Sequence, residues 1–115
     1  MANRPEDLDS RLLQRAANAE ANGRRINEAI ERGEGDAVAA VFVCECGYLG
    51  CNATVELSIA DYEAVRTDFD RFLVVPGHEM EAVDEVVERH ERHLVVVKRG
   101  REARAIVRAA DSREP

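Results

Sequence analysis

Hydrophobic and small residues recur at helical spacing through the first third of the chain. Within residues 5–32 they alternate at intervals of four and three, which is the spacing of one face of a long helix. They stand at Leu12, Ala16, Ala19, Gly23, Ile26 and Ile30. The small residues on this face would let another surface approach closely. The pattern therefore predicts an N-terminal helix that packs either on the sheet of its own domain or on a second copy of the chain.

Two short runs with the pattern of β-strands follow, one on each side of a cysteine-rich loop. Residues 37–43 form an apolar, valine-rich run that is typical of a buried strand. Residues 53–57 alternate, with Val55 and Leu57 on one face and polar side chains on the other. We expect the two runs to pair as an antiparallel hairpin with the cysteines at its tip.

A second helix is predicted directly after this hairpin. Ser58 precedes Asp61 by three residues, the spacing of a capping box, in which each side chain satisfies a backbone amide near the other residue. Leu57 before the cap and Tyr62 four residues beyond it would form a hydrophobic staple. These signals agree on a helix from Ser58 to about Arg66.

The second half of the chain alternates between predicted strands and helices. Residues 71–75 form a strand that Pro76-Gly77 ends. Residues 81–90 carry valines and carboxylates at helical spacing, which predicts a helix with a solvated acidic face. Its inward side chains would be Val83, Val86 and Val87, and its outward ones Glu81, Asp84, Glu85 and Glu88. Residues 94–97 predict another strand, and a last helix is expected over 101–110.

These elements predict an α+β fold in a single domain, residues 1–115. Its parts are the N-terminal helix (5–32), an α+β core around the cysteines (37–98), and a basic C-terminal helix and tail (99–115). We expect one small, mostly antiparallel sheet, the long N-terminal helix and two or three short helices. The hairpin would be stapled to the rest of the core by a metal ion.

Composition limits the stability that the core can supply. Of the 115 residues, 45% are hydrophobic but only 4% are aromatic, and Trp is absent. The core must therefore be built mainly from Val, Leu, Ile and Ala, which bury less area per side chain than aromatic residues do. A small domain of this kind gains much from an additional cross-link such as a bound metal.

Charge and hydropathy disfavour several classes of partner. The net charge of -7 opposes association with a phosphate backbone or an anionic membrane surface. No apolar run approaches the roughly 20 residues that span a bilayer, and the N-terminus lacks the apolar region of a signal peptide. We expect a cytoplasmic protein that contacts no membrane and for which nucleic acid is a disfavoured partner.

All three cysteines lie within residues 44–51, a segment that we call the knuckle. In a reducing compartment such a cluster is more often a metal site than a disulfide. Cys44 and Cys46 are two residues apart, so an extended backbone points both sulfurs to one side. A tight turn at Gly47 and Gly50 would bring Cys51 back beside them.

His78 is the best candidate for a fourth ligand, because the stiff Pro76-Gly77 turn can hold its imidazole at the end of a strand. Three thiolates and one imidazole match a closed structural zinc site. The sequence thus predicts one structural Zn²⁺ held by Cys44, Cys46, Cys51 and His78, with backbone amides of Gly47 and Gly50 compensating its negative charge. His90 or His93, a carboxylate, or water could take the fourth position instead.

Other interpretations of the cysteines remain open. They could be small buried hydrophobic residues, or a thiol-based redox sensor that forms a labile disulfide. Catalytic zinc is disfavoured, because the segment His78-Glu79-Met80-Glu81-Ala82 lacks the second histidine of His-Glu-x-x-His. The deaminase signature is also absent, so we expect a protein that is not an enzyme.

Basic residues gather toward the C-terminus, after an acidic segment at 79–91. They are Lys98, Arg99, Arg101, Arg104 and Arg108, opposed locally by Glu102. The basic segment could pair with the acidic one inside the same domain. It could instead form an electrostatic docking surface for an acidic partner or RNA.

Several of these motifs together resemble a group of small bacterial proteins of unassigned function. The resemblance rests on Asn27-Glu28, Phe42-Val43-Cys44-Glu45-Cys46-Gly47, Cys51, Glu56-Leu57-Ser58, Tyr62-Glu63-Ala64-Val65-Arg66, the segment from Arg71 to Glu79, and Leu94-Val95-Val96-Val97-Lys98. It implies that the three cysteines and the histidine of Pro76-Gly77-His78 belong together, and it brings no activity. The chain departs from the group in its two further histidines, His90 and His93.

The sequence therefore predicts a non-enzymatic, zinc-stabilised interaction or regulatory module. It would bind another protein, or a second copy of the chain, through the N-terminal helix or the knuckle surface. A thiol-based redox sensor and a nucleic-acid-binding zinc ribbon are the alternatives.

Overall fold

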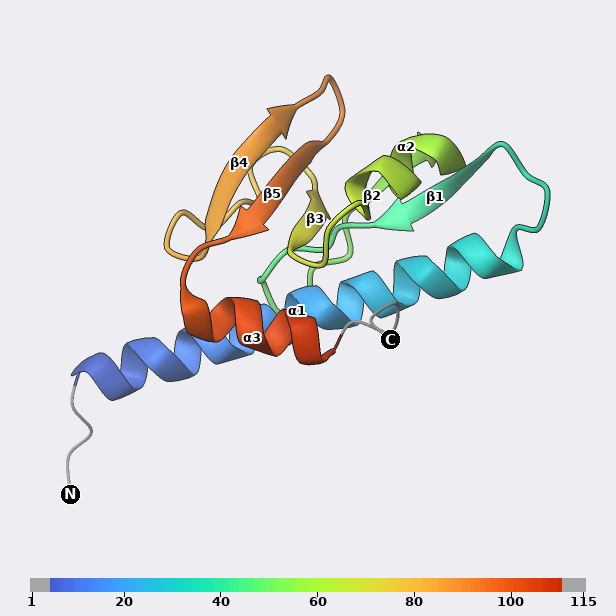
Figure 1. Cartoon of the computed structure of the whole chain (residues 1–115). Coiled ribbons are helices and arrows are strands. Elements are labelled where there is room, and N and C mark those ends of the chain that lie inside the picture. Colours follow the sequence, from blue (N-terminus) through green and yellow to red (C-terminus); the bar gives the residue numbers. More distant parts are fainter. Residues whose placement is uncertain (1–4, 111–115) are drawn as a thin grey trace.

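The computed structural model describes residues 5–110, apart from the side chains of residues 5–10, 12, 13 and 102. The predicted tail from Asp111 and the side chain of Leu12 lie outside the described residues. The elements in chain order are α1 (Pro5–Gly33), β1 (Ala39–Val43), β2 (Thr54–Ser58), α2 (Ile59–Val65), β3 (Arg71–Val74), β4 (Asp84–Arg89), β5 (Leu94–Lys98) and α3 (Arg101–Ala109) (Figure 1). The predicted α+β class is confirmed, with two small antiparallel sheets in place of one: β1–β2 and β3–β5–β4.

The three-stranded sheet is the centre of the molecule, because its strands β3 and β5 are buried on both faces. Phe72 and Val96 pack in one cluster with residues of α1 and α3. Leu73 and Val95 pack in a second cluster with the β1–β2 hairpin and α2. In Figure 1 the helices α1 and α3 lie on one side of the strands and α2 lies on the other. Burial on both faces explains why the sequences of β3 and β5 are nearly continuous apolar runs.

The second helix begins where the capping signals place it. Ser58 is the N-cap of α2, and its hydroxyl accepts a hydrogen bond of 2.9 Å from the backbone amide of Asp61. Tyr62 and Val65 are the buried residues of α2. The ring of Tyr62 stacks on Phe42 of β1 with 4.4 Å between ring centroids, so α2 is held against the inner face of the hairpin.

The helix predicted over residues 81–90 is wrong, because this segment forms strand β4 and pairs antiparallel with β5. A β-bulge shifts the register between Val86 and Glu88, which leaves Val87 as the extra residue and exposes 44% of its side chain. Burial alternates along β4, but its more buried positions are Asp84, Val86 and Glu88, so the valines do not follow the alternation of the strand. Asp84, predicted to face solvent, is buried. β-branched valines also favour a strand over a helix.

The buried face of α1 is more polar than its sequence pattern predicts. It combines small residues with charged and amide side chains: Ala16, Ala17, Glu20, Ala21, Arg24, Asn27 and Glu28. Ile26, which was expected on this face, is 51% exposed, so the predicted apolar face is wrong at that position. Some of the buried polar residues bind backbone groups of the strands, as Arg24 Nη2 does by donating to the carbonyl of Arg71 at 2.8 Å, and others bind charged side chains.

No helix in the described part of the chain is long and apolar enough to cross a lipid bilayer.

A buried charge cluster joins α1, β4 and β5. The ammonium of Lys98 is bound to the carboxylates of both Glu20 and Asp84, and all three side chains are fully buried. Burial raises the pKa of Glu20 to about 8; Lys98 opposes this shift and the neighbouring Asp84 adds to it. Glu20 therefore carries a proton at neutral pH, which leaves one ion pair between Lys98 and Asp84.

The substitution Glu20→Gln should change how stability depends on pH. Folding raises the pKa of Glu20. The stability that protonated Glu20 contributes is therefore fully present below 4.5, its pKa in the unfolded chain, and is lost as the pH rises through about 8, its pKa in the folded protein. Glutamine cannot ionise. As the pH rises across this window, the free energy of unfolding of the variant relative to that of the wild type should therefore increase by up to about 1.4 kcal/mol per pH unit. Urea unfolding of both proteins at a series of pH values measures this difference. A difference that does not change with pH would contradict the buried proton.

Candidate metal centre

The loop between β1 and β2 brings its cysteines to the histidine that follows β3. The sulfurs of Cys44, Cys46 and Cys51 and a ring nitrogen of His78 all lie within 4.8 Å of one another. His78 Nδ1 is 3.3 Å from the sulfur of Cys51 and 3.9 Å from that of Cys46. These are the four residues that the sequence predicts as ligands. Within the part of the chain that the structure describes, they form the one group of at least three His, Cys, Asp or Glu side chains close enough to share an ion.

Cys44 and Cys46 are anchored by the core, whereas Cys51 lies nearer the surface. Cys44 and Cys46 are buried in the same cluster as Phe72 of β3, and Cys51 is partly exposed. The backbone amide of Cys44 also donates to the carbonyl of Ala53 at 2.9 Å, which continues the pairing of the hairpin into the knuckle. Two ligands are therefore positioned by packing and the third by the returning loop.

Glycines let the knuckle turn and lie close to α1. Gly50 has φ of 76°, in the left-handed region that favours glycine. A Cβ on Gly47 would lie 2.8 Å from the Cβ of Ala16 and 2.9 Å from the sulfur of Met80, so a larger residue would push the knuckle away from α1. Gly77, with φ of 95°, makes the turn that delivers His78.

Backbone amides support two of the sulfurs. The amide of Val75 donates to the sulfur of Cys44 at 3.2 Å, and the backbone of Tyr48 hydrogen-bonds Cys46. We predicted such donors at Gly47 and Gly50, whereas those the structure identifies are Val75 and Tyr48. Donors of this kind orient metal-bound thiolates and offset their charge.

The distances in the cluster fit a tetrahedral metal ion. A tetrahedral zinc with metal–sulfur bonds of about 2.3 Å and a metal–nitrogen bond of about 2.0 Å separates sulfur from nitrogen by roughly 3.5 Å. The two distances measured from His78 Nδ1, 3.3 and 3.9 Å, lie on either side of that value. The four side chains are thus arranged so that they could hold one metal ion.

The other two histidines lie elsewhere, at the turn between β4 and β5. The rings of His90 and His93 stack on each other with centroids 4.3 Å apart, and His90 Nε2 lies 2.8 Å from a carboxylate oxygen of Glu88. Neither belongs to the cysteine cluster. Of the three histidines, His78 is the one that the fold brings to the cysteines.

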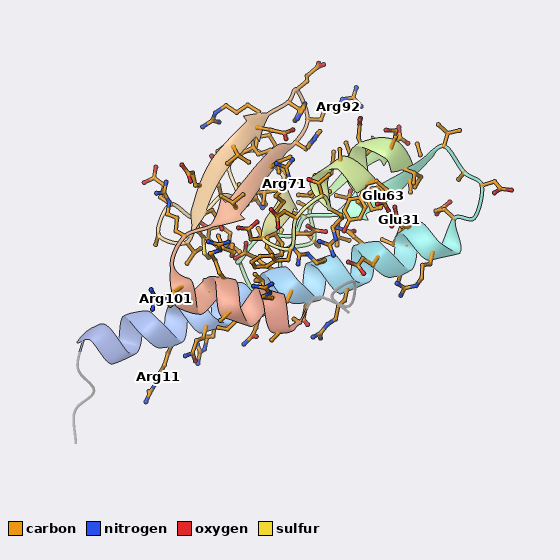
Figure 2. All side chains as sticks on the ribbon, in the orientation of Figure 1. Arg11, Glu31, Glu63, Arg71, Arg92 and Arg101 are labelled. Atoms are coloured by element: carbon orange, nitrogen blue, oxygen red, sulfur yellow. The ribbon has the colours of Figure 1, made fainter. Side chains whose placement is uncertain are left out.

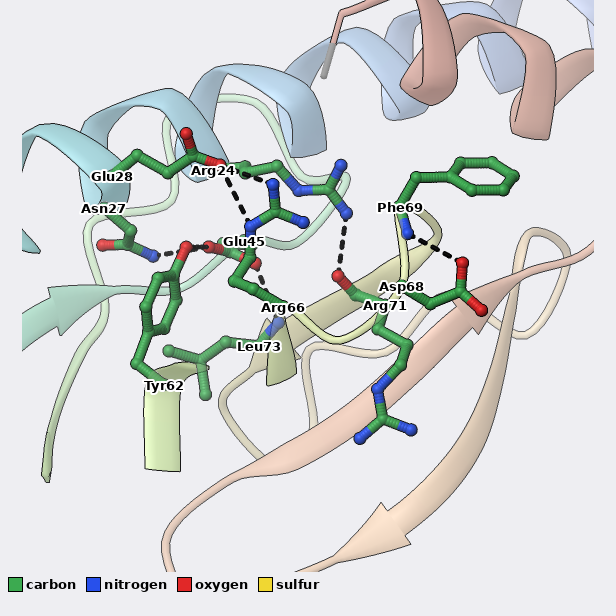
Figure 3. A network of polar contacts seen from close by, with 10 residues as sticks. All are labelled: Arg24, Asn27, Glu28, Glu45, Tyr62, Arg66, Asp68, Phe69, Arg71 and Leu73. Carbon is green, nitrogen blue, oxygen red and sulfur yellow. Dashed lines mark hydrogen bonds and ion pairs between the residues drawn. The ribbon is translucent and has the colours of Figure 1, made fainter. Parts of the chain in front are cut away.

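Glu45, between the first two cysteines, is the residue of the site whose role the sequence did not reveal. Its side chain is fully buried and belongs to the polar network shown in Figure 3. Its carboxylate accepts hydrogen bonds from Tyr62 Oη at 2.6 Å, Asn27 Nδ2 at 2.8 Å and the amide of Leu73 at 2.9 Å. Burial raises the pKa of Glu45, and these three donors oppose that rise.

The backbone of Glu45 and the side chain of Asn27 extend this network to the strands. The amide of Glu45 donates to the carbonyl of Leu73 at 2.7 Å, so the knuckle runs alongside β3. Asn27 donates to the carbonyl of Val43 and accepts from its amide, both at 2.7 Å. The side chain of Asn27 thereby takes the place of a neighbouring strand at the end of β1.

A buried ion pair completes the connection between α1 and α2. Arg66, at the C-terminal end of α2, donates to Glu28 Oε1 through Nε at 3.0 Å and Nη2 at 2.5 Å, and both side chains are almost fully buried.

Asn27-Glu28 and Cys44-Glu45-Cys46 are motifs on which the resemblance to small bacterial proteins rests, but that resemblance assigned no role to Glu45 or Asn27. The available signal was the alternation of an extended segment, which must point Glu45 opposite to its flanking cysteines.

Comparison with known proteins brings no relative: no family model, curated protein or solved structure matches this chain. The resemblance to small bacterial proteins therefore stays a prediction, and function must be argued from the site itself.

Removing the hydroxyl of Tyr62 should weaken the fold more than removing that of Tyr48. Tyr62→Phe keeps the ring stacked on Phe42 but takes one of three donors from a buried carboxylate, which costs about 1–3 kcal/mol. Tyr48→Phe is the matched control, because Tyr48 is 48% exposed. The free energy of unfolding of this variant should differ from that of the wild type by less than about 0.5 kcal/mol. Chemical denaturation of both variants gives the comparison. Equal effects would show that the hydrogen bond to Glu45 contributes nothing to stability.

Proposed function

We propose that the chain is a non-enzymatic protein-interaction module, stabilised by one structural Zn²⁺ at Cys44, Cys46, Cys51 and His78. The observation that carries the proposal is the convergence of four ligand atoms from two distant segments within 4.8 Å. Three thiolates and one imidazole form a soft donor set that suits zinc. His78 follows β3, whereas the cysteines lie in the loop between β1 and β2. The bound ion would therefore connect the hairpin loop to the three-stranded sheet.

A structural role is favoured over a catalytic one by the number of protein ligands. A catalytic zinc keeps one position open for water or substrate, whereas four protein ligands close the tetrahedron. Burial raises the pKa of the Cys44 and Cys46 thiols, so a bound cation would be needed to hold them as thiolates at neutral pH. The thiol-based redox sensor is the alternative in which the cluster carries no metal.

The interaction surface that we propose is the tip of the knuckle. Tyr48 and Leu49 are 48% and 71% exposed, and both line three hollows. One hollow, of about 220 Å³, reaches Ile26 and Ala19 of α1. A second, of about 390 Å³, reaches Met80 beyond β3. The third, of about 300 Å³, reaches His78. Exposed aromatic and aliphatic side chains beside apolar hollows are typical of a protein-binding surface.

Self-association is the other form that this interaction could take. Ile26 lies on the solvent side of α1, 51% exposed, next to the hollow beside the knuckle. A second copy of the chain could cover the same apolar surface. The test below distinguishes the two partners by the mass of the product.

Protein purified without added metal should contain one zinc per chain, measured by native mass spectrometry. His78→Ala should reduce zinc affinity by at least about tenfold, as should Cys46→Ser, whereas His90→Ala should leave it unchanged. The free energy of metal binding also stabilises the folded state relative to the unfolded chain. With free zinc about 1,000-fold above the dissociation constant, chelation should therefore cost about 4 kcal/mol of stability.

Two results would contradict the zinc assignment. The first is wild-type protein that folds with no bound metal and keeps its thermal unfolding temperature in chelator. The second is a His78→Ala variant that retains zinc as tightly as His90→Ala does.

A photo-reactive amino acid at Leu49 should form a discrete adduct with a partner in cells of the source organism. The same probe at Val38, which is 81% exposed between α1 and β1, serves as the control for exposure alone. Adding Tyr48→Asp to the Leu49 probe should abolish the adduct without loss of zinc. An adduct twice the mass of the chain identifies self-association. The same adducts from both probe positions would reject the knuckle as a binding surface.

A further inference from the structure

A cavity on the outer face of α3 is lined by basic side chains. Arg101, Arg104 and Arg108 recur at intervals of three and four, so they share one face of the helix. With Phe69 and Ala105 they line a cavity of about 570 Å³. It is a broad hollow that is open to solvent, with a volume in the range of roughly 300–1,000 Å³ found for small-molecule sites. Figure 2 shows Arg101 at the start of α3, projecting from the helix.

The charged side chains that line this cavity are all basic, although the chain as a whole carries a net charge of -7. Arg104 Nε lies 3.4 Å from a carboxylate oxygen of Asp70. Lys98 also lines the cavity, but its ammonium is bound to the buried carboxylates of Glu20 and Asp84. Arginines on successive turns of one helix face are close enough to bind one anion together.

Phe69 adds an aromatic surface beside the arginines. The guanidinium carbons of Arg104 and Arg108 lie 5.4 and 5.0 Å from the centroid of its ring. The ring is partly exposed and borders the cavity. Aromatic rings and guanidinium planes are the surfaces on which nucleobases stack. The cavity therefore combines groups that bind a phosphate with groups that bind a flat ring.

We propose that this cavity binds a nucleoside monophosphate. Guanidinium groups recognise phosphate oxygens by paired hydrogen bonds, so Arg101 and Arg108 would hold the phosphate. The base would stack on the guanidinium plane of Arg104, which itself lies over the ring of Phe69. This proposal does not depend on the zinc site or on the knuckle surface, and metal-replete protein can be used throughout.

A free nucleotide fits this surface better than a nucleic-acid strand. α3 has nine residues, so at 1.5 Å per residue its basic face is about 14 Å long and can neutralise only a few phosphates. The acidic charge of the rest of the chain would repel a longer phosphate backbone.

Isothermal titration calorimetry with adenosine and guanosine 5′-monophosphate tests the proposal on the full chain. At least one nucleotide should bind with a dissociation constant below about 1 mM, and inorganic phosphate should bind at least about tenfold more weakly. The double variant Arg101→Gln/Arg108→Gln leaves the Arg104–Asp70 pair in place and should weaken nucleotide binding at least about tenfold. Arg92→Gln is the control, because it removes an arginine at the turn between β4 and β5, far from α3 (Figure 2).

Three results would overturn the proposal. The first is the absence of saturable binding of either nucleotide up to about 5 mM. The second is an equal loss of affinity in Arg92→Gln and in the double variant. The third is a single-stranded oligonucleotide that binds more tightly than the mononucleotides with a steep dependence on salt, which would make the surface a nucleic-acid site.

Discussion

The carboxylate of Glu45 is the constraint on which the arrangement of the candidate metal centre depends. An unpaired buried carboxylate would cost several kcal/mol, so the fold must bring donors to it. The donors come from three elements: Asn27 of α1, Tyr62 of α2 and the amide of Leu73 in β3. Because side chains alternate along an extended segment, holding Glu45 on one side directs Cys44 and Cys46 to the other. The polar network and the cysteine cluster thus lie on opposite sides of one short segment.

The same use of buried polar groups recurs across the interior of this aromatic-poor protein. Lys98 joins Glu20 and Asp84, Arg66 joins Glu28, and Arg24 lies over the ring of Phe72 at 3.8 Å. Such groups contribute less net stability than apolar packing of equal volume, but an incorrect register would leave them unsatisfied. We infer that they determine which surfaces of α1 and the sheets meet, while the apolar clusters and the proposed zinc supply most of the stability.

Local patterns predicted the elements whose signals lie within a few neighbouring residues. The capping signal at Ser58, the strands on either side of the knuckle and the stop at Gly77 all required only local chemistry. The cysteines and His78 were also identifiable, because few other roles suit three thiols in one turn. The burial of Glu20 could not be predicted, because its partners Lys98 and Asp84 are more than 60 residues away in the chain. β4 was missed because Asp84 and Glu88 occupy its more buried positions while Val87 is exposed, so its apolar residues do not alternate in the sequence.

The central claim is that the cysteine cluster and His78 hold a single zinc ion. X-ray absorption at the zinc edge, on protein purified without added metal, tests the identity of the metal and its ligands together. The account predicts a first shell of three sulfurs at about 2.3 Å and one nitrogen at about 2.0 Å. Absence of zinc from folded protein, or a shell made only of oxygen and nitrogen, would contradict it.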